Sequence, residues 1–109
     1  METQEIIDTV LQDLKARLVH HLGDRLIQFI LFGSRARGDY EEESDIDVAV
    51  IVKGLGRDEK INILDEIAEV ELDHLMPVSA FIISQEEYNK LLKRERRIAL
   101  DIRKRGVPL

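Results

Sequence analysis

The chain has 109 residues, of which 44% are hydrophobic and 35% are charged, and its formal net charge at pH 7 is −6. This length predicts one domain, residues 1–109, that is large enough to bury a core. The chain has no cysteine, which excludes a disulfide framework and a thiolate zinc site. Its acidic beginning lacks the pattern of a signal peptide, and no apolar run is long enough to span a membrane, so we expect a cytoplasmic protein with no membrane partner.

The spacing of apolar residues predicts a helix and two strands in the first half of the chain. Over residues 3–21 they recur at three- and four-residue intervals, as on one face of an amphipathic helix. From Leu26 to Phe32 the chain is nearly continuously apolar, which is typical of a strand buried on both faces. A second strand is expected from Asp45 to Val52. Its alternating side chains place Ile46, Val48, Val50 and Val52 on one face, and Asp45, Asp47, Ala49 and Ile51 on the other.

Two more helices and one strand are expected in the second half. A helix from Asp58 to Leu75 is predicted to bury Ile61, Leu64, Ile67, Ala68, Leu72 and Leu75, with Ile63 and Val70 widening the stripe. A strand follows from Pro77 to Ile83. Ser84 and Glu87 form a capping box that opens a last helix, expected to continue to about Arg105. This order of elements predicts an α+β fold, a small mixed β-sheet with helices packed on one side.

The last predicted helix differs in charge from the rest of the chain. Between Lys90 and Arg105 there are eight basic and two acidic residues, a net +6, which leaves −12 on the remaining residues. A basic helix on an acidic domain is compatible with RNA, an acidic partner or a neighbouring subunit, so an oligomer stays open. Nucleic acid is less favoured, because no aromatic side chains are interleaved and basic residues near a helix C-terminus also favour the helix dipole.

Asp45 and Asp47 are the first candidate functional residues. On one face of a strand, their Cα atoms would lie roughly 6.5–7 Å apart. Two carboxylates at that separation repel each other unless a cation lies between them, and Mg²⁺ prefers carboxylates together with phosphate oxygens. An isolated pair of this kind is more often simply solvated at the start of a strand. A metal site therefore needs support from elsewhere in the sequence.

That support comes from the turn after the first strand. Gly33 lets a ligand approach the backbone closely, and successive N–H groups in such a turn can bind an anion. Ser34 offers a hydroxyl donor and a candidate N-cap for a short helix, while Arg35 and Arg37 offer guanidinium groups suited to phosphate. An ordinary turn with surface arginines is the alternative. The aspartate pair about ten residues later makes a phosphate site the more specific interpretation.

Together these residues carry a resemblance to a known family. Gly33-Ser34-x-Ala36-Arg37-Gly38, followed by Ser44-Asp45-x-Asp47, resembles the signature of the minimal nucleotidyltransferases of the DNA polymerase β-like nucleotidyltransferase superfamily. The resemblance implies that Asp45 and Asp47 are catalytic and bind Mg²⁺, and that the nucleotide is held by Gly33, Ser34, Arg37 and Ser44. It also implies the reaction, in which ATP or another nucleoside triphosphate gives a nucleoside monophosphate to a hydroxyl and releases pyrophosphate.

One feature departs from the family pattern. Catalytic members usually carry a third carboxylate on the next core strand, whereas residues 77–83 contain neither Asp nor Glu. Ser79 is the residue expected at the matching position. Glu71 and Asp73 are the nearest acids upstream, and they are expected on the preceding helix or loop. This departure weakens the case for catalysis more than the case for nucleotide binding.

Two functions follow from the resemblance. The first is Mg²⁺-dependent transfer of AMP from ATP to a hydroxyl of a HEPN-domain toxin, with this chain as the antitoxin, since minimal nucleotidyltransferases are often encoded beside such a protein. The alternative is a non-catalytic nucleotide-binding or antitoxin subunit that neutralises its partner by forming a complex. Transfer to a small molecule such as an aminoglycoside, or to RNA ends, is a third and weaker interpretation.

Overall fold

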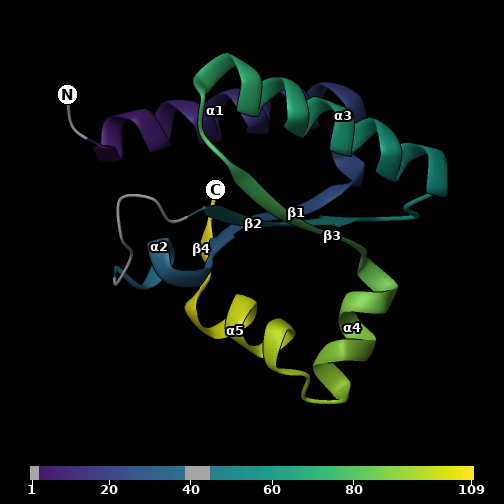
Figure 1. The fold of residues 1–109 in the computed structure, drawn as a ribbon. Helices are drawn as coiled ribbons and strands as arrows, with labels where there is room; N and C mark the ends of the chain where they lie inside the picture. The colour runs from purple at the N-terminus through teal and green to yellow at the C-terminus, as the bar shows by residue number, and fades with distance from the viewer. Residues whose placement is uncertain (1–2, 39–44) are drawn as a thin grey trace.

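The computed structural model describes residues 3–38 and 45–109, which form a four-stranded sheet between layers of helices (Figure 1). In chain order the elements are α1 (Thr3–Leu22), the 3₁₀ helix η1 (Gly23–Arg25), β1 (Leu26–Phe32), α2 (Gly33–Arg37), β2 (Ile46–Val52), α3 (Arg57–His74), β3 (Val78–Ser84), α4 (Gln85–Lys93), α5 (Arg97–Arg105) and β4 (Val107–Pro108). The predicted first helix and first strand are confirmed, and β2 and β3 each begin one residue later than expected.

The sheet is mixed, as predicted, with strand order β3-β2-β1-β4. β1 is antiparallel to β2 and to β4, whereas β2 is parallel to β3 because α3 carries the chain back to the end of the sheet where β2 began. The start of β2 therefore lies between the end of β1 and the start of β3. In the register of the sheet, Asp47 is the partner of Phe32 on one side and of Ser79 on the other.

Each face of the sheet is covered by its own helices. α1 and α3 pack on one face, and α4 and α5 pack on the other (Figure 1). The first core contains the predicted β2 face, Ile46, Val48, Val50 and Val52. The second core contains Ala49 and Ile51 of β2 with Tyr88, Ala99 and Ile102 of the last helices. The α+β class and the alternation of β2 are confirmed.

The expectation that helices pack on one side of the sheet is wrong. β1 and β2 carry aliphatic side chains on both faces, and Ile30 and Ile51 would be left in water if only α1 and α3 covered the sheet. Both residues are buried by the last two helices.

The single long helix expected after Ser84 is also wrong, because the chain reverses at residues 94–96. The capping box itself is confirmed, since the Ser84 hydroxyl accepts a hydrogen bond from the Glu87 N–H at 3.1 Å. α4 then ends in a Schellman motif, in which Glu95 adopts a left-handed φ of 54° and the Arg96 N–H donates to the Leu91 carbonyl at 3.0 Å. This turn folds α5 back across the sheet toward α2.

α3 has two apolar stripes. The buried stripe is the one that contains Ile63 and Val70, which were predicted only to widen the main stripe. Ile63, Ile67 and Val70 lie in the core. Of the positions predicted to be buried, only Ile67 is; the others are exposed, namely Ile61, Leu64, Ala68, Leu72 and Leu75. Both stripes have helical spacing, so periodicity alone does not tell which of them faces the sheet.

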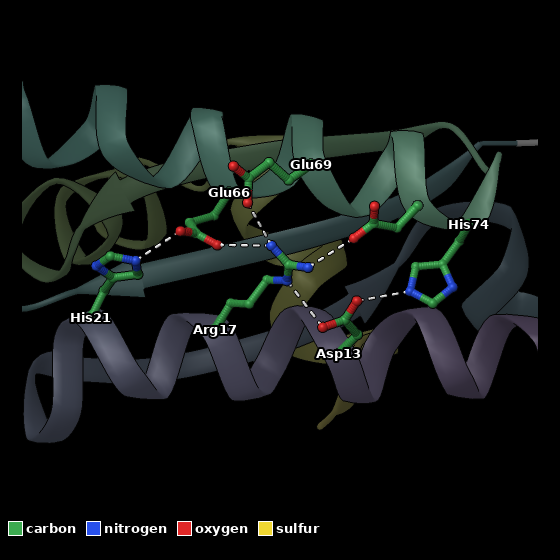
Figure 2. A network of polar contacts seen from close by, with 7 residues as sticks. Asp13, Arg17, His21, Glu66, Glu69 and His74 are labelled. Atoms are coloured by element: carbon green, nitrogen blue, oxygen red, sulfur yellow. Dashed lines mark hydrogen bonds and ion pairs between the residues drawn. The ribbon is translucent and has the colours of Figure 1, made fainter.

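Arg17 of α1 lies at the centre of a polar network between α1 and α3 (Figure 2). Its guanidinium is paired at 2.7–3.3 Å with four carboxylates, those of Asp13, Glu66, Glu69 and Asp73. Two histidines extend the network at 2.8 Å, His21 to Glu66 and His74 to Asp13. These contacts join the two helices on the face of the sheet opposite to the one that Asp47 shares with Ala49 and Ile51.

Candidate nucleotide and metal site

Asp45 and Asp47 flank the first residue of β2. Asp45 is exposed and immediately precedes the strand, while Asp47 is half-buried within it. Burial raises the pKa of the Asp47 carboxyl, and the negative charge of Asp45 raises it further. The two carboxylates are therefore close enough to interact. A second negative charge beside a partly desolvated one is stabilised by a divalent cation, so the pair fits Mg²⁺ chemically.

Gly33 brings the turn after β1 against this carboxylate pair. It has a left-handed φ of 75°, and a Cβ placed on it would lie 3.1 Å from the carboxyl carbon of Asp47 and 3.2 Å from its Cβ. A glycine is thus required both by the backbone conformation and by the position of Asp47. The glycine-serine turn therefore packs directly against Asp47, and a side chain at residue 33 would not fit in this position.

α2 begins at Gly33, so Ser34 lies in the first turn of the helix. The expectation that Ser34 is the N-cap is therefore wrong. Phe32 occupies the N-cap position and makes no side-chain cap. The helix closes with Gly38, whose N–H donates to the Ser34 carbonyl at 2.9 Å. The first N–H groups of a helix have no carbonyl partner within it, and they attract an anion. Ser34 is half-buried at this same end of α2.

The two arginines of α2 differ in their surroundings. Arg35 is buried, with 7% of its surface exposed, whereas Arg37 is exposed. The positive charges of Arg37 and Arg35 both act on Asp47 and lower its pKa, against the larger effect of burial and of Asp45. Both guanidinium groups therefore lie near the aspartate pair. Arg37 is the one within reach of a ligand in solvent.

Asp101 of α5 joins this region, and sequence reasoning missed it. Its Oδ2 lies 4.0 Å from Nη1 of Arg37. The sequence offered no signal for this contact, because a continuous last helix would not fold back toward α2. Ser44, which the resemblance assigned to nucleotide binding, lies outside the described residues.

Ser79 is the partner of Asp47 in the register of the sheet, which is the position expected for it from the family resemblance. The side chain is exposed and shares a face of the sheet with Asp47. Within residues 3–38 and 45–109, no group of three or more His, Asp or Glu side chains is arranged to hold a metal ion. The described part of the site therefore offers two carboxylates to a metal.

These features define a candidate nucleotide site on an α+β fold, in which a glycine-serine turn faces two strand aspartates. Residues 12–99 match the family described as "Polymerase beta, Nucleotidyltransferase", and the chain belongs to this family.

Among the described residues, no helix is both long and apolar enough to cross a membrane.

Curated relatives from Methanocaldococcus jannaschii are similar over shorter stretches. "Putative protein adenylyltransferase MJ0141" is 51% identical over 49 residues, which are 45% of this chain and 48% of that protein. "Putative protein adenylyltransferase MJ0604" is 38% identical over 66 residues, which are 61% of this chain and 62% of that protein. The chain thus spans between about half and three fifths of the length of these two relatives.

Solved structures are similar in fold. A "putative minimal nucleotidyltransferase" gives a TM-score of 0.62 at 21% identity, over 100% of this chain and 97% of that chain. A chain of a structure described as "the toxin-antitoxin with AMP-PNP" gives a TM-score of 0.56 at 19% identity, over 89% of this chain and 70% of that chain. At these identities the similarity shows the fold alone.

Proposed function

We propose that this chain is a Mg²⁺-dependent nucleotidyltransferase that transfers AMP from ATP to a hydroxyl group of a partner protein. The proposal is carried by the packing of Asp47 against Gly33, which puts a turn suited to phosphate beside a pair of carboxylates. Family membership supports nucleotidyl transfer as the class of reaction. The names of the relatives, which describe protein adenylyltransferases, support AMP as the transferred group and a protein as its acceptor.

Each residue of the site has a role in this proposal. The backbone N–H groups at Gly33, the Ser34 hydroxyl and the Arg37 guanidinium bind the phosphates, together with Ser44. Asp45 and Asp47 hold Mg²⁺, which when bound neutralises the charge of the triphosphate and of the leaving pyrophosphate. The protein therefore contributes position and charge, which are the main requirements of phosphoryl transfer.

The proposed transfer needs one group that the described residues do not supply beside Asp47. The acceptor oxygen forms a bond to the α-phosphorus while the bond from that phosphorus to pyrophosphate breaks, and the hydroxyl proton passes to a base. Ser79 occupies the position where a third carboxylate would take that proton. We assign the base to the partner protein or to the substrate itself.

The proposed partner is a HEPN-type toxin, with a tyrosine hydroxyl as acceptor and this chain as the antitoxin. The support is the resemblance of the signature to the minimal nucleotidyltransferases and the fold shared with a chain of a toxin-antitoxin structure that contains AMP-PNP. Attachment of AMP would add a bulky negative group to the toxin and thereby block its activity.

A second candidate function is neutralisation of the partner by complex formation without transfer. The specific observation that favours it is Ser79 next to Asp47, because a two-carboxylate site retains affinity for a metal nucleotide and lacks its own base. The two candidates share the nucleotide site and differ only in the chemical step.

Transfer of label separates the two candidates. The partner encoded beside this chain is incubated with the wild-type protein, Mg²⁺ and ATP that carries a radioactive α-phosphate, and the Asp45→Asn/Asp47→Asn variant is the control. Label on the partner with the wild type alone is the expected result. A stable complex that silences the partner while no label is transferred would instead establish the non-catalytic function.

A further inference from the structure

A surface groove shares Arg37 with the candidate nucleotide site. It is a groove of about 800 Å³ between α2 and α5, lined by Arg37 on one side and by α5 and the turn before it on the other. We call it the α2–α5 groove. It exists because the chain reverses at Glu95 and brings α5 back against α2. The single straight helix that the sequence predicted would not form this groove.

The described lining of the groove is positively charged. Among the residues that the structure describes, four basic side chains line it, Arg37, Arg97, Lys104 and Arg105, against the two carboxylates of Glu95 and Asp101. Arg97, Lys104 and Arg105 are exposed, and within the described part of the chain none of the three is paired with a carboxylate. Asp101 lies 4.0 Å from Arg37, so Glu95 is the one other described carboxylate of the lining beside the three cations of α5. Such a surface attracts an anionic ligand.

The position of the groove connects it to the transfer reaction. Its α2 wall is the helix that starts at Gly33, and Arg37 acts electrostatically on Asp47. A molecule that contacts Arg37 in the groove would therefore lie at the far end of the short helix that begins at the candidate nucleotide site. An acceptor bound there would be close to a nucleotide held at Gly33 and Ser34.

The lining of the groove favours a protein over a nucleic acid. The described residues that line it include no aromatic side chain, whereas single-stranded nucleic acids are usually bound by stacking their bases on aromatic residues. It does contain Leu100 and Ile98, and Ile98 is 38% exposed. Apolar side chains among unpaired cations suit a protein segment that presents both aliphatic and acidic residues.

We propose that the α2–α5 groove binds the acceptor protein through an acidic, amphipathic segment next to the hydroxyl that receives AMP. This inference rests on the proposed function for the identity of the acceptor, but binding in the groove does not require the chemical step. It assigns the basic α5 to recognition of the substrate protein, with α2 shared between the acceptor and the nucleotide.

Binding of model probes tests the inference without knowledge of the natural acceptor. The probe is a fluorescent peptide in which one tyrosine is surrounded by glutamate and leucine, and its anisotropy is measured with the full chain at low and at physiological salt. A peptide with lysine in place of glutamate and a fluorescent single-stranded RNA serve as comparisons. We expect the acidic peptide to bind best and to weaken as salt rises.

Two matched variants locate the binding. Arg97→Glu/Lys104→Glu reverses two charges in the groove, and Lys93→Glu/Arg94→Glu reverses the same two residue types at the exposed end of α4, outside it. We expect the groove variant to lose at least tenfold in affinity for the acidic peptide and the α4 variant to lose less than threefold. Circular dichroism of both variants confirms that they are folded.

The outcomes separate this inference from the proposed function. Equal losses in the two variants, or no preference for the acidic peptide, would overturn the groove assignment. Tighter binding of the RNA that depends on Arg97 and Lys104 would replace the protein acceptor with a nucleic acid. Binding of MgATP is measured in the same samples: if it persists while the peptide result fails, only the groove assignment is wrong, and if the wild type binds no MgATP, the proposed function fails.

Discussion

The carboxyl group of Asp47 occupies the space that a side chain at Gly33 would fill. A Cβ on residue 33 would lie 3.1 Å from the carboxyl carbon, and Asp47 is the sheet neighbour of Phe32, the residue just before Gly33. The end of β1 and the start of β2 therefore pack together as one candidate binding site. The shape of this site depends on an aspartate and a glycine that are 14 positions apart in the sequence.

Gly33→Ala tests the contact between Gly33 and Asp47, with Gly38→Ala as a control that introduces similar backbone strain. Gly33 and Gly38 both have positive φ, 75° and 83°, so alanine costs about 1–2 kcal/mol at either position. Only at Gly33 does the added Cβ meet another atom, whereas Gly38 has nothing within 4 Å. We expect Gly33→Ala to lower the free energy of unfolding by roughly 1–3 kcal/mol more than Gly38→Ala. Urea unfolding measures both, and equal losses would refute the contact.

Asp47→Asn is expected to stabilise the metal-free protein at neutral pH. The pKa of Asp47 is raised, chiefly by burial and then by the charge of Asp45, so the folded state holds the proton more tightly than the unfolded state. This contribution to stability is complete at low pH and is lost as the pH rises through the raised pKa. Asparagine carries no negative charge, so the Asp47→Asn variant should be more stable than the wild type at neutral pH. In acid, where Asp47 is protonated, this difference in stability should disappear.

Thermal unfolding of the metal-free protein at pH 7 and in acid measures the effect of Asp47→Asn. Asp24→Asn is the control, because Asp24 is exposed and has no hydrogen-bond or ion-pair partner among the described residues. A melting temperature for Asp47→Asn at or below that of the wild type at pH 7 would argue against a strained carboxylate pair.

Ser79→Asp restores a third carboxylate beside Asp47. Because the two residues are partners in the parallel register of β2 and β3, the new carboxylate would join the face that carries Asp47. We expect affinity for Mn²⁺ to rise on the order of tenfold, since cation affinity increases with the number of charged ligands. Ser79→Asn is the uncharged control, and titration calorimetry measures both. Equal affinities in the two variants would place Ser79 outside the metal site.

Arg17 is expected to stabilise the packing of α1 against α3 by holding four carboxylates together. Without its guanidinium, Asp13, Glu66, Glu69 and Asp73 would be left close to one another. We expect Arg17→Met to lower the melting temperature at pH 7. Lys60→Met removes the same charge at an exposed position of α3 whose side chain has no partner among the described residues, and it should have little effect.

The same network predicts a loss of stability in acid. His74, followed by Arg17, lowers the pKa of Asp13, and His21, followed by Arg17, lowers the pKa of Glu66. Lowered pKa values mean stability that is present above the unfolded values and is lost as the pH falls through the folded ones. The wild type should therefore lose melting temperature on acidification below about pH 4.5, the ordinary range of these carboxyls. The Arg17→Met variant should lose less.

The sequence was sufficient to predict β1, β2 and β3, and the aspartate pair at the start of β2, because their patterns are local, whereas the two-residue strand β4 was not predicted. The apolar run from Leu26 to Phe32 has a single interpretation, and the alternation of β2 placed Val48 and Ile51 on opposite faces correctly. The proximity of Gly33 to Asp47 depends on the antiparallel pairing of β1 and β2, which brings the end of one strand next to the start of the other and which the local patterns did not predict.

The errors concern features that only tertiary packing decides. Ile63 and Leu64 belong to two stripes of equal periodicity on α3, and the sheet selects the first. The reversal at Glu95 has no glycine or proline to signal it, because a glutamate takes the left-handed position that glycine usually fills. That reversal added α5 to the second helical layer and created the contact of Asp101 with Arg37 and the α2–α5 groove, and none of the three could be derived from local patterns.

Calorimetric titration of MgATP into the wild type and Asp47→Asn tests the central claim most directly, with Asp24→Asn as the control for charge. If Gly33, Ser34 and the aspartate pair form one nucleotide site, the wild type and Asp24→Asn bind with equal affinity and Asp47→Asn binds at least tenfold more weakly, about 1.4 kcal/mol. Equal affinity of all three proteins, or no binding by the wild type, would contradict the assignment of Gly33, Ser34 and the aspartate pair to one nucleotide site.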